Sequence, residues 1–526
     1  MTASLASNPS PDVPDFVLVS DLHMGQGRSE DPPRYSPMEE FFYDESFARL
    51  LQHLQARYGQ DPDSLVLVIN GDAFDFLTMT RIPDPKVAAE YGFEVRMAER
   101  RFGLNPTPRK SVYGLDQIVA GHPIAIEALA RFVAAGFQVE ILRGNHDLEL
   151  FFEPVQQRLR EHLTRMPGGP SPKEAAARVR FHQWFLLIPG RLYIEHGNQY
   201  ESSNSIRYPL RPVLSTRQRR GEQEDVLDYP LGSIFVRYFY NSVHRINPYQ
   251  PKLVSFEQYL DFLRSYNLLD LLRIARGHYP FFIRTLRPNT TAGSTGPSRE
   301  DDAQQADDFR QASQNSELPE LHQQLNQIKV HPASASKLAL VQAMTRPIFK
   351  RVAWFSATAF GALYVWLLIF SLIQATPWLA ENVFAKAVLM AVLAISTLAV
   401  LIWLVNYLGW RLRRQHDSTA EMLAERADRI ARLTGVKLVL MGHTHLVDAR
   451  KVADGRATYA NSGTWVAVDN PWERIDHDAR RFTLLLVQGD RVQVSRWNDN
   501  AGRIETVPMF DLPPAEETAR GERTAW

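Results

Sequence analysis

Aspartate, histidine and asparagine side chains recur in five short motifs that are spread over most of this 526-residue chain. The motifs are Asp21-Leu22-His23, Gly71-Asp72-Ala73-Phe74-Asp75, Gly144-Asn145-His146-Asp147, Glu195-His196-Gly197-Asn198 and Gly442-His443-Thr444-His445. Carboxylate, imidazole and amide groups together suit divalent ions such as Mn²⁺, Fe and Zn²⁺ better than Ca²⁺. The motifs therefore predict a metal site, provided that the fold brings them to one place.

Each motif directly follows a short apolar run of the kind that forms a buried strand. The runs are FVLVS (16–20), LVLVIN (65–70), FQVEILR (137–143), RLYI (191–194) and KLVLM (437–441). Loops that leave the carboxyl ends of neighbouring strands converge on one crevice, where ligands bind. We therefore expect the first and last motifs to meet at one edge of a sheet.

The composition excludes several kinds of chemistry. The 59 basic and 59 acidic residues give a formal net charge of zero, so no nucleic-acid partner is expected. The absence of cysteine excludes disulfides, thiolate zinc sites and a cysteine nucleophile. No Gly-Lys pair occurs, so the chain has no Walker A phosphate loop. Water is the expected attacking group, and the sequence does not indicate an oligomeric state.

Two long uncharged stretches predict a membrane hairpin, because a membrane-crossing helix needs about 20 mostly apolar residues. We place the two helices at about 353–374 and 387–409. Lysines and arginines lie before the first stretch and after the second, which puts both outer flanks on the cytoplasmic side. The expectation is an integral protein of a bacterial inner membrane, with its catalytic part in the cytoplasm. The alternative is a pair of buried core helices.

The remaining pattern predicts an α/β protein in which strand-like runs alternate with helical stretches. The expected segments are a disordered leader (1–14), an α/β part (15–204), a helical insert (205–286), a flexible linker with some helix near its end (287–335), the membrane hairpin (336–416), a second α/β part (417–511) and a disordered tail (512–526). Residues 481–497 read as a hairpin that turns at Gly489-Asp490. The insert is interpreted as a helical subdomain, a cap over the crevice or a surface that rests on the bilayer.

Taken together, the five motifs resemble the calcineurin-like metallophosphoesterase superfamily, whose pattern is D-x-H, G-D-x-x-D, G-N-H-[DE], a lone His and G-H-x-H. The resemblance covers residues 15–204 and roughly 417–500. It implies a four-layer αββα sandwich, interrupted here by the helical insert and the transmembrane helical hairpin. It also implies two divalent metal ions, with Mn²⁺ preferred over Fe or Zn²⁺.

The resemblance assigns a role to each motif residue. It implies that one ion is bound by Asp21, His23 and His445, that the second is bound by Asn145, His196 and His443, and that Asp72 bridges both. His146 is implied to lie beside the substrate as a catalytic group. Asp75 resembles the carboxylate that orients this histidine, and the residues alone leave Asp147 open for the same role.

The expected reaction is hydrolysis of a phosphoester or pyrophosphate bond by a metal-bridging hydroxide. The motif wording is particularly similar to the UDP-2,3-diacylglucosamine pyrophosphohydrolase branch, which implies a lipid-linked nucleotide as substrate at a membrane surface. A phosphodiesterase of soluble nucleotides and a phosphoprotein phosphatase are the alternative enzymes. A membrane-tethered scaffold that retains the fold without turnover is the alternative outside enzymes.

Overall fold

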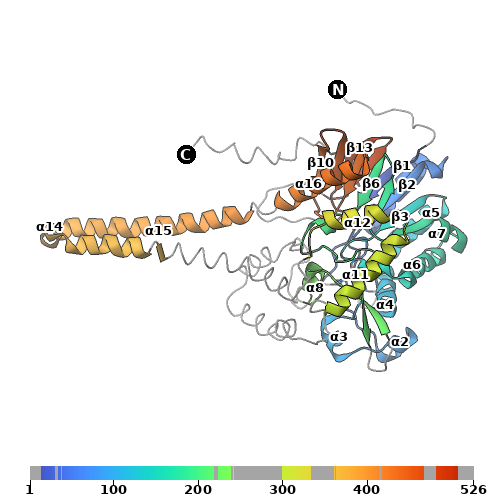
Figure 1. Ribbon diagram of the computed structural model, residues 1–526, viewed down its shortest axis with the longest axis horizontal. Coiled ribbons are helices and arrows are strands. Elements are labelled where there is room, and N and C mark those ends of the chain that lie inside the picture. Colours follow the sequence, from blue (N-terminus) through green and yellow to red (C-terminus); the bar gives the residue numbers. More distant parts are fainter. Residues whose placement is uncertain are drawn as a thin grey trace. The chain divides into compact units, whose positions relative to one another are not determined.

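The computed structural model describes residues 13–29, 34–36, 38–217, 223–238, 241, 299–332, 360–361, 363–413, 417–466 and 481–507 (Figure 1). The chain divides into two compact units. The first consists of Met1–Lys337 together with Ala420–Trp526, and the second is Leu338–Thr419. All five motifs belong to the first unit.

A seven-stranded mixed sheet forms one half of the first unit, in the order β14-β13-β12-β1-β2-β3-β4. Its strands are β1 (Asp15–Val19), β2 (Leu65–Asn70), β3 (Gln138–Leu142), β4 (Val179–His182), β12 (Thr483–Gln488), β13 (Arg491–Asn498) and β14 (Arg503–Thr506). The strands β1 to β4 are parallel, and Val17, Leu67 and Val139 lie in register. The first three motifs therefore leave the sheet at the same edge.

A five-stranded sheet forms the other half, in the order β10-β11-β9-β6-β5. Its strands are β5 (Phe185–Ile188), β6 (Leu192–Glu195), β9 (Leu438–Met441), β10 (Val447–Val452) and β11 (Ala457–Ser462). Strand β6 runs parallel to β9, with Tyr193 opposite Val439. This pairing brings the fourth and fifth motifs together, although the second unit separates them in the chain.

Alternating side chains explain how the two sheets pack. Phe16 and Leu18 of β1 join a cluster with Ile194 of β6 and Leu440 of β9, which fills the space between the sheets. Val17 and its neighbours on the opposite face of β1 pack in a second cluster, against helices. The described elements thus form a helix–sheet–sheet–helix arrangement, which agrees with the predicted α/β fold.

Helices cover the outer face of each sheet. Apolar side chains of α1, α4, α5 and α6 pack on the seven-stranded sheet, and those of α16 and of α12 (Pro319–Ile328) pack on the five-stranded sheet. The helix bounds are α1 (Asp44–Tyr58), α2 (Pro85–Glu90), α3 (Met97–Phe102), α4 (Pro108–Gly121), α5 (Pro123–Ala134), α6 (Glu153–Arg165), α7 (Pro172–Arg178) and α16 (Asp417–Thr434). Short 3₁₀ turns are η1 (Pro62–Ser64), η2 (Leu148–Phe151) and η3 (Asn198–Tyr200).

The predicted helical insert, 205–286, begins with a different structure. Its first described elements are the antiparallel strands β7 (Val213–Arg217) and β8 (Gln223–Leu227), and α8 (Leu231–Tyr238) follows. Val213 and Leu227 lie in the main core cluster, which explains why this part forms a two-stranded sheet on the domain instead of a separate helical core. Of the residues after α8 in the insert, 239–286, the structure describes Asn241.

The segment expected to be a flexible linker with some helix near its end, 287–335, is more helical than expected, because α11 (Arg299–Gln314) forms within it as well as α12 (Pro319–Ile328). Phe309 and Leu325 are buried in the core cluster of the second sheet. Further along, the Val330 backbone N–H donates to the Gln199 carbonyl at 2.9 Å. The segment is mostly polar in composition, but a few of its apolar side chains pack into this cluster and attach the segment to the domain.

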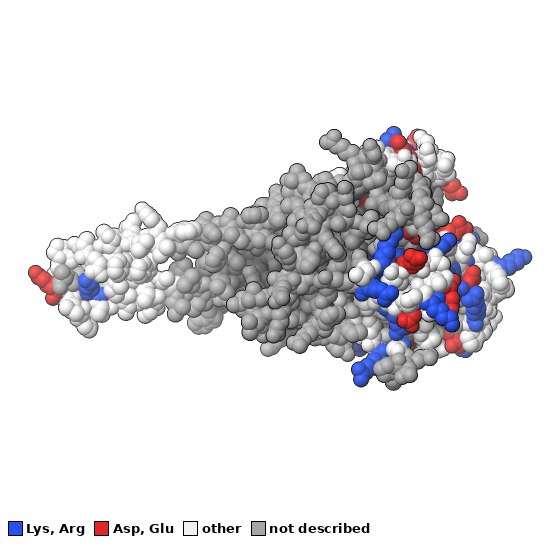
Figure 2. Space-filling view, turned by 90° about the horizontal axis from the view of Figure 1, so that it is seen from below, with Lys and Arg blue, Asp and Glu red and all other residues white. Residues whose placement is uncertain are grey.

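The second unit contains the segments predicted to cross the membrane. Residues 363–375 are helical, and α14 (Pro377–Glu381) and α15 (Val383–Arg413) follow. In the portion that the structure describes, no helix combines the length and apolar character needed to span a membrane, so the spans predicted at 353–374 and 387–409 find no support there. Many large apolar side chains of this unit are nevertheless exposed, among them Phe384 and Trp378. Charged side chains are sparse on this surface (Figure 2).

Candidate metal centre

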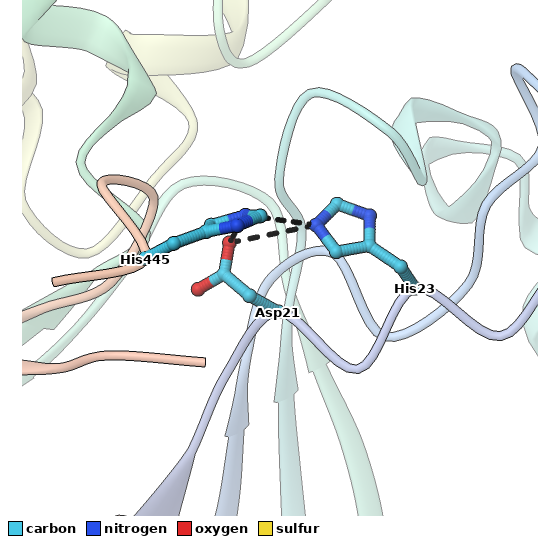
Figure 3. A group of neighbouring side chains, drawn as sticks. All are labelled: Asp21, His23 and His445. Atoms are coloured by element: carbon cyan, nitrogen blue, oxygen red, sulfur yellow. Dashed lines mark hydrogen bonds and ion pairs between the residues drawn. The ribbon is translucent and has the colours of Figure 1, made fainter. Parts of the chain in front are cut away.

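The first and last motifs meet at the carboxyl ends of β1 and β9. The Nε2 atom of His445 lies 3.2 Å from Oδ1 of Asp21, and it lies 3.1 Å from Nε2 of His23. The three side chains point toward one another (Figure 3). Two ligand atoms that bind one ion at about 2.1 Å and at right angles lie about 3 Å apart, so these spacings suit a shared ion.

A second group forms beside the first. One ligand atom each from Asp72, His196 and His443 lies within 4.8 Å of the others. The Oδ2 atom of Asp72 lies 3.2 Å from Nε2 of His196 and 3.9 Å from Nε2 of His23. Asp72 therefore stands between the two groups. Its other oxygen, Oδ1, accepts the backbone N–H of His146 at 2.7 Å.

Among the described residues, the buried Oδ1 of Asn145 has no hydrogen-bond partner, and the buried Oδ1 of Asp21 and Nε2 of His196 have only an ion-pair neighbour each, His445 and Asp72 at 3.2 Å. A buried polar atom without a partner costs about 1–3 kcal/mol, so native proteins rarely leave several of them in one place. All three atoms are the ones that would face a cation. The donor set and its unsatisfied atoms therefore fit divalent metal ions.

The backbone at the predicted ligands is unusual. Left-handed φ angles occur at Asp21 (54°), His23 (51°), Asp72 (52°), His443 (72°) and His445 (60°). Residues with a Cβ rarely adopt this conformation, and such positions concentrate at functional sites, where the surrounding structure imposes them. Here they let short loops turn sharply and direct consecutive polar side chains into the crevice.

Two glycines make room for the ligands. A Cβ atom at Gly71, which has a φ of +80°, would lie 2.4 Å from Nδ1 of His196. A Cβ atom at Gly144 would lie 2.1 Å from Oδ1 of Asp72. Because Nδ1 of His196 pairs with the Asn70 carbonyl oxygen at 2.9 Å, its Nε2 atom is directed toward Asp72. The glycines of the motifs are thus required by close contacts.

Charges in the site depend on one another. Burial alone would raise the pKa of Asp72, but His196 and His146 hold it well below its usual range. Burial alone would lower the pKa of His196, but Asp72 and Asp21 raise it to about 10. The carboxylates are therefore ionised and need nearby positive charge, which a divalent ion supplies more strongly than a protonated imidazole.

The two aspartates considered for orienting His146 have different contacts. Oδ1 of Asp75 lies 3.1 Å from Nδ1 of His146. Asp147 instead accepts the backbone N–H groups of Gly144 and Ala73 at 2.6 and 2.8 Å, and so ties two motif loops together. Burial and the neighbouring Asp72 raise the pKa of Asp147 to about 7. The geometry therefore favours Asp75 as the partner of the His146 ring.

The structure also brings in residues that the motif analysis missed. Oε2 of Glu201 lies 2.8 Å from Nε2 of His443. The hydroxyl of Ser233, on α8, donates to the Asn145 carbonyl at 2.9 Å. Neither residue belongs to a motif, and no local pattern marks them. They could be found only from the three-dimensional proximity of distant segments.

The fold and site define an α/β protein whose loops gather neighbouring groups of His and Asp side chains that could hold metal ions. The chain matches the calcineurin-like phosphoesterase family over residues 14–280, about half of its length, and it belongs to that family. It is therefore a metal-dependent phosphoester hydrolase. The match includes the first four motifs, and strand pairing adds the fifth. No curated protein matches the chain.

Proposed function

We propose that the protein hydrolyses a phosphoester or pyrophosphate bond in a two-metal site built from both ends of the chain. The observation that carries this proposal is the convergence of His445 with Asp21 and His23, next to the group around Asp72. The chemistry that two divalent ions supply when bound is activation of water and neutralisation of phosphoryl charge.

The proposed ligand roles combine the motif resemblance with the side-chain groups that the fold brings together. Asp21, His23 and His445 would hold one ion, and His196 and His443 would hold the other. Asn145 would join the second set, because its motif and its buried, unpartnered Oδ1 support that role. Asp72 would be shared by the two ions, since its carboxylate lies next to both groups and its Oδ1 already accepts the His146 backbone N–H. Mn²⁺ is the proposed ion, with Fe or Zn²⁺ as alternatives that the same ligands accept. A scaffold without activity would have no need of this complete set.

His146 is the proposed general acid. Its Nδ1 atom faces Asp75, so Nε2 is the nitrogen left to approach the substrate. A protonated Nε2 would donate its proton to the leaving oxygen, and Asp75 would keep the ring oriented. The contact is 3.1 Å long and both residues are nearly buried, which favours a fixed orientation.

The proposed substrate is a lipid-linked nucleotide with a pyrophosphate bond, cleaved at the cytoplasmic face of a membrane. Two features support this choice. The residues in and around the motifs are similar to those of the UDP-2,3-diacylglucosamine pyrophosphohydrolase branch, and the second unit has exposed apolar side chains, such as Phe384 at 80% and Trp378 at 61% exposure. Burial of such a surface against lipid is favourable. A soluble nucleotide is the second candidate, and hydrolysis of vesicle-embedded and soluble substrates separates the two.

The direct test is Mn²⁺-dependent hydrolysis of bis(p-nitrophenyl) phosphate and p-nitrophenyl phosphate by the purified full chain. The wild type should turn over at least one of these esters, and the Asp72→Asn variant should be far slower. The His146→Gln variant should be slowed most on substrates whose leaving group is more basic than p-nitrophenolate. If wild type and variants prove equally inactive on these esters and on a broad panel of nucleotides and pyrophosphates, the proposed function is wrong.

A further inference from the structure

Glu201 has no role in the proposed reaction, but it contacts His443, one of the proposed metal ligands. Its Oε2 atom lies 2.8 Å from Nε2 of His443, and both side chains are largely buried, at 12% and 5% exposure. An imidazole has two nitrogens, and the contact with Glu201 leaves Nδ1 for a metal ion. A carboxylate that accepts the other ring N–H fixes the ring and makes it a better ligand.

Glu201 is itself held in place. Its carboxylate accepts the Ser203 hydroxyl at 2.5 Å and the Asn204 side-chain amide at 2.9 Å. Its backbone carbonyl accepts the N–H groups of Asn204 and Ser205 at 3.0 and 2.8 Å. The loop 201–205 is therefore a compact turn that presents one carboxylate oxygen to His443. A side chain with this many fixed contacts can orient its partner at little further entropic cost.

The same loop touches the inserted helix α8. The Gly232 backbone N–H donates to the Ser203 carbonyl at 2.7 Å, and a Cβ atom on Gly232 would lie only 2.1 Å from Oδ1 of Asn204. The next residue, Ser233, donates its hydroxyl to the Asn145 carbonyl at 2.9 Å. The start of α8 thus supports both the turn that holds Glu201 and the loop that carries Asn145.

We infer that Glu201 is a positioning residue for the second metal ion, and that α8 is coupled to that ion through the 201–205 turn and Ser233. The inference rests on the proposed function, since His443 and Asn145 are its ligands for the second ion. In the part of the chain that the structure describes, the ligands of the first ion meet this network through the His443 backbone N–H, which donates to Oδ2 of Asp21 at 3.1 Å, whereas Glu201 contacts the His443 ring. The two ions should therefore respond differently when the network is changed.

The test measures metal binding by the full chain and does not depend on activity. EDTA-treated wild type and a Glu201→Gln variant are titrated with Mn²⁺ by calorimetry, and metal content is measured after dialysis. The wild type should bind two ions per chain. Glu201→Gln should keep one site at wild-type affinity and bind the other about 10–100-fold more weakly. Electron paramagnetic resonance should then show uncoupled Mn²⁺ at concentrations that give a coupled pair in the wild type.

A matched control is available in the same domain. Oε2 of Glu140 lies 2.7 Å from Nε2 of His182, a similar carboxylate–imidazole pair that contains no motif residue. Glu140→Gln should leave both affinities unchanged. Gly232→Ala should weaken the second site without altering any ligand or Glu201 itself, because the added methyl group displaces Asn204.

Each remaining result is decisive. Wild-type affinity for both ions in folded Glu201→Gln would overturn the positioning role. Equal weakening of both ions by Glu201→Gln and Glu140→Gln would reduce the effect to general destabilisation and would also overturn it. Wild-type binding in folded Gly232→Ala would remove the coupling to α8. A wild type that binds no ion would instead refute the proposed function, and this inference with it.

Discussion

The Nε2 atoms of His23 and His445 lie 3.1 Å apart, although 422 residues separate the two histidines in the chain. Strand β1 precedes the first and strand β9 precedes the second, and the two strands belong to different sheets. The packing of those sheets against each other is what brings the rings together. The site is thus a property of the whole first unit and not of any local segment.

Replacing the carboxylate between the two groups should remove metal binding and activity together. Asp72→Asn keeps the size of the side chain and an oxygen for the His146 backbone N–H, but it loses the negative charge shared by two ions. We expect activity to fall about 10³-fold or more, since bound metal contributes several kcal/mol to such reactions. Metal content after dialysis is the accompanying measurement. An unchanged metal content would show that Asp72 is no ligand.

His146→Gln should separate catalysis from metal binding. His146 contacts Asp75 and is not needed as a ligand, so the variant should retain both ions. Its kcat should fall about 10²–10⁴-fold, the usual contribution of a general acid. The loss should shrink with substrates whose leaving group needs no proton, such as p-nitrophenolate. A variant that loses its metal instead would assign the ring to the ligand set.

Metal removal should lower thermal stability. The ligands are buried carboxylates and imidazoles with unsatisfied atoms, so an ion that binds only the folded state stabilises it. At a free concentration about 100 times its Kd, one ion contributes about 2.7 kcal/mol. Differential scanning fluorimetry should show a Tm several degrees higher with Mn²⁺ than with EDTA. The Asp72→Asn variant should show a smaller shift, and an identical shift would count against the site.

His122 should make stability depend on pH at a place outside the metal site. It is fully buried, with Nδ1 at 3.1 Å from Asp44 and Nε2 at 3.5 Å from Glu39. Burial alone would lower the pKa of His122, but its contacts with Asp44 and Glu39 raise it to about 9. A raised histidine pKa stabilises the fold fully below the unfolded value near 6.5, and the effect is lost as the pH rises through about 9.

The corresponding measurement is urea unfolding of EDTA-treated wild type and His122→Gln. The difference in unfolding free energy should be larger near pH 6 than near pH 10, by up to about 3 kcal/mol. The packing change is common to both conditions and cancels. A difference that does not vary with pH would mean that the buried ring is neutral in the folded state.

Adding charge to the apolar surface of the second unit should impair action on lipid. Phe384 and Val388 lie one turn apart on α15, at 80% and 46% exposure. The double variant Phe384→Glu, Val388→Glu should lose flotation with phospholipid vesicles and hydrolysis of vesicle-embedded pyrophosphates, while its rate on soluble aryl esters is unchanged. Lys386→Gln serves as the control on the same helix. Equal vesicle activity of wild type and double variant would favour a soluble substrate.

The strands that precede the motifs could be predicted from sequence, because each is a short apolar run followed directly by metal-binding residue types. The run at 16–20 corresponds to β1 (Asp15–Val19), and the run at 437–441 to β9 (Leu438–Met441). The hairpin predicted at Gly489-Asp490 joins β12 to β13. Each of these elements has a local sequence pattern that is sufficient to predict it without knowledge of the rest of the fold.

Other features could not be predicted, because they depend on contacts between distant segments. Glu201 has no distinctive neighbours in sequence, and only the approach of His443 gives it a partner. The helices α11 and α12 lie in a polar segment whose docking depends on Phe309 and Leu325. Average composition describes such a segment as a linker, although two buried side chains decide its structure.

Anomalous diffraction from crystals grown with Mn²⁺ tests the two-ion site most directly. The account predicts two manganese peaks on either side of Oδ2 of Asp72, one among Asp21, His23 and His445 and the other among Asn145, His196 and His443. The absence of manganese between these residues at saturating metal, or peaks that involve only one end of the chain, would contradict it.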